Sequence, residues 1–112
     1  MGFFEEKQGD ILIEIVQLTR ATLKEAQEFK EICLKDIQNG WKKIIIDLSF
    51  CEFIDSTFLG SLVVCLKRVN ELGGGLRLIG FHSNVNSLFE LTGLNRVFLS
   101  FKTKEEALNS FN

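Results

Sequence analysis

Three consecutive isoleucines, Ile44-Ile45-Ile46, constrain the fold of this chain more than any other segment. β-Branched side chains favour extended backbone, and the side chains of a strand point alternately to its two faces. A run in which every residue is apolar therefore predicts a strand, over residues 43–48, that is covered on both faces. Such strands are typical of the middle of a parallel sheet with helices packed on each side.

Segments with strand and helix periodicity alternate along the chain. Strands are expected over residues 3–7, 11–18, 43–48, 76–81 and 97–101, and helices over residues 22–38, 57–72, 83–91 and 103–110. The first two strands are expected to pair antiparallel through a short turn. The alternation that follows favours right-handed crossovers between parallel strands. The sequence thus predicts an α/β fold with a mostly parallel mixed sheet, helices packed on it, and an N-terminal antiparallel strand pair.

The length and the net charge of the chain limit the classes of function that we expect for it. The chain has 112 residues, so we expect a single domain over residues 1–112. Its net charge is −2 and its lysines and arginines are scattered, which argues against a nucleic-acid partner. No secretory signal or membrane-spanning run is evident, so a cytoplasmic location and no membrane contact are expected. The cysteines Cys33, Cys51 and Cys65 are interpreted as small buried hydrophobic residues, and no metal or cofactor is expected.

The triplet Asp55-Ser56-Thr57 stands where the second long helix is expected to begin. The spacing favours Asp55 as the helix cap, and Ser56 and Thr57 are also common capping residues. The alternative for Ser56 is a phosphorylation switch, because free N–H groups and the positive dipole end at a helix start tolerate a phosphate. The preceding loop is expected to carry Phe50 and Phe53 inward.

The second helix has two contrasting faces. The face expected to pack on the sheet consists of Phe58, Leu59, Leu62, Cys65, Leu66, Val69 and Leu72. Ser56, Gly60, Val64 and Lys67 fall on the opposite side. A glycine inside a helix costs about 1 kcal/mol relative to alanine. Gly60 therefore indicates either close packing or a flat track along which another protein approaches.

An enzymatic function is not expected. A serine–histidine triad would need His82, the single histidine, and the sequence contains no G-x-S-x-G motif. A small hydrolase with Ser56 or Cys65 as nucleophile would lack a positioned base. Gly73-Gly74-Gly75 follows a helix and precedes a strand, the opposite order to a phosphate-binding loop, so it is expected to end the helix.

Four short segments occur in a characteristic order. They are Ile44-Ile45-Ile46-Asp47-Leu48-Ser49, Phe53-Ile54-Asp55-Ser56-Thr57-Phe58-Leu59-Gly60, Gly73-Gly74, and Leu91-Thr92-Gly93-Leu94 with Phe98. Together they resemble the bacterial anti-sigma factor antagonist family, whose domain is the STAS domain, over residues 11–108. The resemblance implies a binding module whose unphosphorylated form binds an anti-sigma factor serine kinase and releases a sigma factor, so that transcription is regulated. The kinase phosphorylates the module, and a PP2C-type phosphatase resets it.

Carried over by position, the resemblance implies phosphorylation at Ser56. The partner-binding residues that it implies are Asp55, Ser56, Thr57, Phe58, Gly60, Val64, Thr19 and Arg20. Two positions depart from the family pattern: Phe58 replaces a glycine, and Thr19, followed by Arg20, replaces an acidic residue. A basic residue at this place could pair with a phosphate.

A second function remains open on the sequence alone. Some relatives are constitutive STAS scaffold or adaptor subunits of signalling or lipid-transport complexes, and Ser56 would then be a simple helix cap. The N-terminal strand pair also leaves an edge that could support a weak homodimer.

Overall fold

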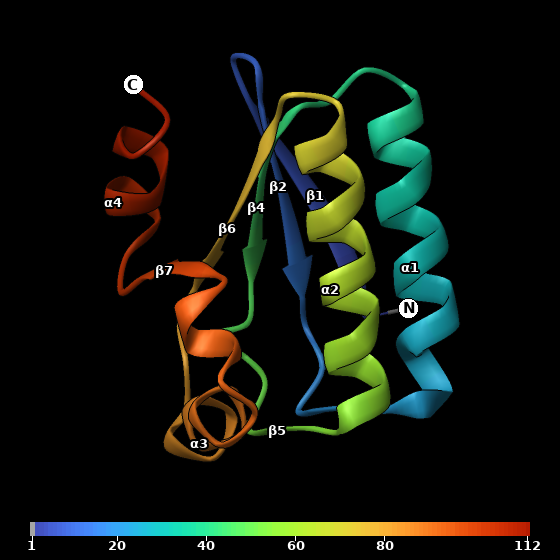
Figure 1. The fold of residues 1–112 in the computed structure, drawn as a ribbon, viewed down its shortest axis with the longest axis vertical. Coiled ribbons are helices and arrows are strands. Elements are labelled where there is room, and N and C mark those ends of the chain that lie inside the picture. Colours follow the sequence, from blue (N-terminus) through green and yellow to red (C-terminus); the bar gives the residue numbers. More distant parts are fainter. Residues whose placement is uncertain (1) are drawn as a thin grey trace.

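A five-stranded sheet lies at the centre of the structure, a computed structural model that describes residues 2–112 (Figure 1). Its strands, in spatial order, are β1 (Phe3–Gln8), β2 (Ile11–Val16), β4 (Lys43–Asp47), β6 (Gly75–Ile79) and β7 (Leu99–Phe101). β1 pairs antiparallel with β2, and all other neighbours are parallel. The isoleucine run lies in β4, the middle strand, and Ile44, Ile45 and Ile46 are each 0% exposed. The predicted α/β fold with its mixed sheet is confirmed.

Helices cover the two faces of this sheet unequally (Figure 1). The long helices α1 (Leu23–Gln38) and α2 (Ser56–Glu71) pack side by side on one face, and α4 (Lys104–Asn109) packs on the other. The short helix α3 (Ser83–Thr92) lies at the end of the molecule where α1 and α2 begin. Within residues 2–112, no helix has the length and apolar character needed to cross a membrane.

Helix boundaries follow the capping signals of the sequence. Thr22 caps α1 in a capping box with Glu25, and Gly73, with φ of 81°, follows the end of α2. Leu72 was expected on the packed face of α2, but it is the C-cap of this helix and is 40% exposed. The last strand starts at Leu99 rather than at residue 97, because a 3₁₀ turn (Leu94–Arg96) takes up the preceding residues.

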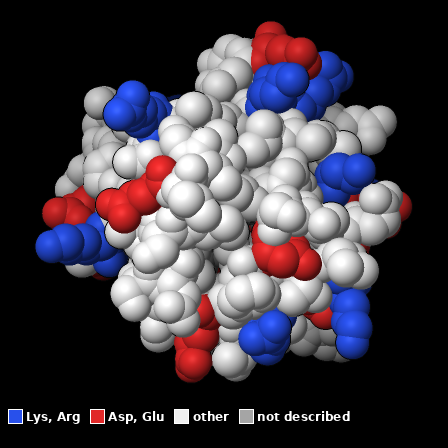
Figure 2. All heavy atoms as spheres, turned by 60° about the horizontal axis from the view of Figure 1, so that its bottom comes forward, with Lys and Arg blue, Asp and Glu red and all other residues white. Residues whose placement is uncertain are grey.

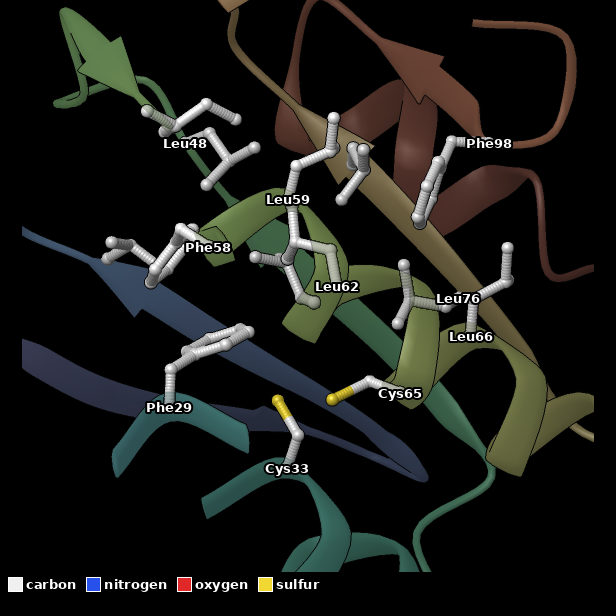
Figure 3. Packing of buried hydrophobic residues seen from close by; sticks show 14 of the residues in the cluster. Phe29, Cys33, Leu48, Phe58, Leu59, Leu62, Cys65, Leu66, Leu76 and Phe98 are labelled. Carbon is white, nitrogen blue, oxygen red and sulfur yellow. The ribbon is translucent and has the colours of Figure 1, made fainter. Parts of the chain in front are cut away.

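The main core fills the space between the sheet and the α1–α2 pair (Figure 3). The rings of Phe29 from α1 and Phe58 from α2 pack with their centres 5.0 Å apart. Cys33, about one turn after Phe29 in α1, faces Cys65, about two turns after Phe58 in α2 (Figure 3). Because the two helices share this buried seam, their outer sides are held at a fixed separation.

The loop between β4 and α2 differs from the prediction. Phe50 and Phe53, expected to point inward, are 48% and 37% exposed, whereas Cys51 and Ile54 are buried. For Phe53 the reason is a second, two-stranded sheet formed by β3 (Arg20–Ala21) and β5 (Phe53–Ile54), whereas Phe50 lies in the turn after β4. Alternation along β5 turns Ile54 into the core and Phe53 outward.

A buried acidic residue interrupts the apolar face of β2. Glu14 is 1% exposed, on the face of the sheet that α1 covers, and lies opposite Glu5 of β1. Burial, together with the neighbouring carboxyl groups of Asp36 and Glu5, raises the pKa of Glu14 to about 10. Burial also raises the pKa of Asp36. The Glu14 side chain is therefore protonated at neutral pH in the protein without bound cations.

This proton makes the stability depend on pH. In the unfolded chain the pKa of a glutamate is about 4.3, so the unfolded state loses its proton long before the folded state does. The free energy of unfolding should consequently fall as the pH rises from about 5 to about 10. Glu14→Gln removes this titration and keeps the side-chain shape. We expect the variant to be more stable than the wild type at pH 8.5, by at least about 1 kcal/mol, and to gain less at pH 5.5.

Urea denaturation at the two pH values, in buffer with EDTA, measures this difference. Glu90→Gln, at an exposed position of α3, is the matched control and should behave as the wild type at both. A stability difference between Glu14→Gln and the wild type that is independent of pH would contradict the assignment of the proton.

Candidate functional site

The starts of α1 and α2 lie side by side, and the carboxylate of Asp55 joins them. Its Oδ1 accepts a hydrogen bond of 2.8 Å from the backbone N–H of Phe58, which caps α2. Its Oδ2 accepts a hydrogen bond of 2.9 Å from the N–H of Leu23, the first residue of α1. The backbone N–H of Asp55 also donates to the carbonyl of Ala21 in β3, at 3.2 Å. One side chain thus satisfies free N–H groups of two helices and fixes this end of the molecule.

Ser56, the first residue of α2, is exposed. Asp55 provides the cap, and no hydrogen bond found within residues 2–112 involves the Ser56 hydroxyl. Ser56 therefore does not act as the cap of α2, and its phosphorylation stays a prediction. Its hydroxyl is free to react at the positive end of the α2 dipole.

A groove runs between the outer sides of α1 and α2, away from the sheet. Its first part is lined by Leu23, Ala26, Gln27, Lys30, Thr57, Gly60, Ser61 and Val64. Val64 also lines a second depression, which continues past Lys67 towards Leu72. We call this continuous feature the α1–α2 groove. Its head, at Thr57, lies next to Ser56.

Gly60 opens the floor of this groove. A Cβ atom placed on Gly60 would meet no heavy atom within 4 Å, so close packing inside the chain does not explain the glycine. The outer residues Ser56, Gly60, Val64 and Lys67 are all exposed, as the helical spacing predicted. Ser61, which sequence reasoning missed, is buried because its hydroxyl donates to the carbonyl of Phe58 one turn back, at 2.6 Å.

The remaining residues of the predicted partner-binding set fall into different environments. Phe58 is 0% exposed, so the prediction that it contacts a partner is wrong; its ring packs on Phe29 in the core. Thr19, just before β3, and Arg20, its first residue, are exposed. The guanidinium of Arg20 lies over the ring of Phe53, 4.3 Å from its centre, in a cation–π contact. Arg20 is thus already engaged beside β5, just before Asp55 and Ser56.

The end of the molecule that carries Ser56 is poor in charge. Figure 2 shows uncharged side chains across the middle of this end, with most acidic and basic side chains around its rim. Several apolar side chains are exposed on its elements, namely Leu23, Phe50, Phe53 and Leu91. Phe53 and Leu91 line one hollow between β5 and α3. Contiguous exposed apolar surface is typical of protein interaction sites, and the hollow at Phe53 and Leu91 is a place at this end where two exposed apolar side chains share one depression.

The hydrolase alternative finds no support in this geometry. Cys65 is 0% exposed and faces Cys33, so no substrate could reach its thiol. Burial raises the pKa of Cys51 to about 12, which keeps that thiol protonated and unreactive. His82 is the exposed N-cap residue of α3, and its side chain makes no capping hydrogen bond.

The double role of Asp55 leads to a stability prediction. Asp55→Ala leaves the N–H groups of Phe58 and Leu23 without their acceptor, and loss of one such cap typically costs about 1 kcal/mol. We expect the free energy of unfolding to fall by about 2 kcal/mol in urea denaturation. Asp10→Ala, which removes only an exposed ion pair with Lys43, should cost less than about 0.5 kcal/mol. Equal losses in the two variants would argue against the bridging role.

Two groups of relatives share much of this sequence. A Thermotoga maritima protein assigned as an anti-sigma factor antagonist is 30% identical over 106 residues, which cover 94% of each chain. The anti-sigma-B factor antagonist of Staphylococcus aureus is 34% identical over 67 residues, or 60% of this chain and 62% of the relative.

Solved structures agree with the fold. The crystal structure of an anti-sigma factor antagonist from Thermotoga maritima superposes with a TM-score of 0.88 at 28% identity, over 96% of this chain and 92% of the other. The phosphorylated form of the Bacillus cell fate determinant SpoIIAA has the same fold, with a TM-score of 0.76 at 17% identity, over 98% and 99% of the two chains. A model of the STAS domain family matches residues 8–107. The chain therefore belongs to the STAS domain family.

Proposed function

We propose that this protein is an anti-sigma factor antagonist that is switched by phosphorylation at Ser56. The observation that carries the proposal is the free, exposed hydroxyl of Ser56 beside the head of the α1–α2 groove, on a helix start that Asp55 already caps. The relatives from Thermotoga and Staphylococcus, which are assigned as anti-sigma factor antagonists, support the class of partner.

In the unphosphorylated form, the surface around Ser56 is the docking surface for an anti-sigma factor serine kinase. Gly60 and Thr57 leave the head of the groove shallow, so the backbone of a partner can approach α2 closely. Burial of the exposed rings of Phe50 and Phe53 favours association by about 25 cal/mol for each Å² of apolar surface removed from water. Binding of the kinase at this surface frees the sigma factor.

A phosphate on Ser56 disfavours docking of the kinase at this surface. It adds a charge of about −1.5 to −2 beside a surface that offers little charge, and a docked partner would have to desolvate it. The domain itself tolerates the phosphate, because the group sits at the positive end of α2. The exposed position of Ser56 also allows a PP2C-type phosphatase to remove it. All of these partners are proteins of the cytoplasm.

Charge at Ser56 should therefore weaken partner binding without unfolding the domain. We expect Ser56→Ala to bind the anti-sigma factor kinase as the wild type does, and Ser56→Asp to bind at least about tenfold more weakly, a loss of about 1.4 kcal/mol. Pull-down from a lysate of the source organism identifies the partner, and titration calorimetry then measures the affinities. Ser100→Asp, which adds the same charge on the edge strand β7, is the matched control.

Equal capture by wild type, Ser56→Ala and Ser56→Asp would contradict the switch. The domain would then be a constitutive STAS scaffold or adaptor subunit. Mass spectrometry of the protein isolated from cells, with Thr57→Ala as a comparison, tests whether Ser56 rather than its neighbour carries the phosphate.

Gly60 allows the groove to be tested separately from the charge. A side chain at this position has room in the free protein, so Gly60→Gln should unfold at the same urea concentration as the wild type or at a higher one. The same side chain would occupy the head of the groove, and we expect it to weaken partner binding at least about tenfold. Asn70→Gln, on the same helix but outside the groove, is the control. Unchanged affinity in Gly60→Gln would place the docking surface elsewhere.

A further inference from the structure

Three carboxyl groups converge between β1, β2 and α1, remote from the helix starts that carry Ser56. They belong to Glu5, Glu14 and Asp36, and one oxygen atom from each lies within 4.8 Å of the others. Glu5 and Glu14 are direct partners in the antiparallel register of β1 and β2. Asp36 comes from the far end of α1, close to its last residue, Gln38. The cluster thus joins an edge strand, its neighbour and a helix.

Two of these groups are buried without a partner outside the cluster. Glu14 is 1% and Asp36 8% exposed, and no donor from another residue in the described part of the chain reaches Oε2 of Glu14 or Oδ2 of Asp36, so the proton of Glu14 is shared only within the cluster. Within residues 2–112, no lysine or arginine forms an ion pair with any of the three carboxyl groups. Lys7 lowers the pKa of Asp36, but its amino group lies over the ring of Trp41, 5.7 Å from the centre. Buried polar atoms without partners are costly, so the site favours a cationic ligand.

We propose that Glu5, Glu14 and Asp36 form a binding site for a hard divalent cation. Because the three oxygens are at most 4.8 Å apart, a point about 2.8 Å or less from all of them exists, close to the 2.3–2.6 Å of Ca²⁺–oxygen bonds. Carboxylate oxygens are the ligands preferred by Ca²⁺, Mn²⁺ and Mg²⁺.

The surroundings select among these cations. Glu14 and Asp36 are buried and leave little room for water, whereas Glu5 is exposed and offers the entry path. Mg²⁺ usually keeps several of its waters, and Ca²⁺ accepts a flexible set of carboxylate oxygens. The site therefore suits Ca²⁺ or Mn²⁺ better than Mg²⁺. A bound cation would link the edge strand β1 to α1 and leave the α1–α2 groove untouched.

Titration of the EDTA-treated protein with CaCl₂, MnCl₂ and MgCl₂, each by calorimetry and by thermal unfolding, tests the proposal. We expect one Ca²⁺ or Mn²⁺ per chain, a dissociation constant below about 1 mM, and a rise of several degrees in the unfolding temperature at saturation. Glu14→Gln and Asp36→Asn should abolish both effects, and Glu5→Gln should weaken binding at least about tenfold. Glu28→Gln, at an exposed position of α1, is the matched control and should bind as the wild type does.

Two results would overturn the site. The first is an unfolding temperature of the wild type that millimolar CaCl₂ and MnCl₂ leave unchanged, in which case Glu14 and Asp36 share a proton only. The second is equal affinity of Glu14→Gln and the wild type for the cation, which would show that the cation binds elsewhere on the surface. The amide variants keep the shape of the carboxyl groups, and circular dichroism verifies that they are folded.

Discussion

The carboxylate of Asp55 is the interaction on which the arrangement of the site depends. A helix start leaves backbone N–H groups without partners, and two helix starts side by side double this demand. Asp55 meets part of it for both α1 and α2 with its two oxygens. Because Asp55 caps α2 and also accepts the first N–H of α1, which Thr22 caps, the adjacent hydroxyl of Ser56 is not needed as a cap. The same contact fixes the width of the groove at its head, where the two helices are closest to the proposed phosphorylation site.

The core-packing side of α2 and the proposed binding surface lie on opposite sides of the helix. Phe58, Leu62 and Cys65 face the core, where Phe58 packs on Phe29 and closes the seam between the helices. Gly60 and Val64 face outward and contribute little to this core. The outer side can therefore change to fit a partner without loss of the fold. This division also accounts for the large apolar residue at position 58, because its ring fills space between α1 and α2.

The sequence predicted those features that are encoded locally. The isoleucine run, the capping box at Thr22 and the glycines after α2 located the central strand and the helix ends, because each depends on residues close in the chain. The resemblance to the STAS family pointed to Ser56, whose phosphorylation stays a prediction. The remaining features depend on contacts between distant segments. The strands β3 and β5 have two residues each, too few for a periodic pattern, and their pairing turned Phe53 outward. The carboxyl cluster became visible only when the strand register placed Glu5 opposite Glu14.

The parallel course of α1 and α2 has an electrostatic consequence. Both helices begin at the same end of the molecule, so their positive dipole ends lie together, and aligned neighbouring dipoles repel each other (Figure 1). The single negative charge of Asp55 only partly offsets this repulsion. A second anion at this end would offset more of it. The proposed phosphorylation of Ser56 would then stabilise the isolated domain at the same time as it weakens partner binding.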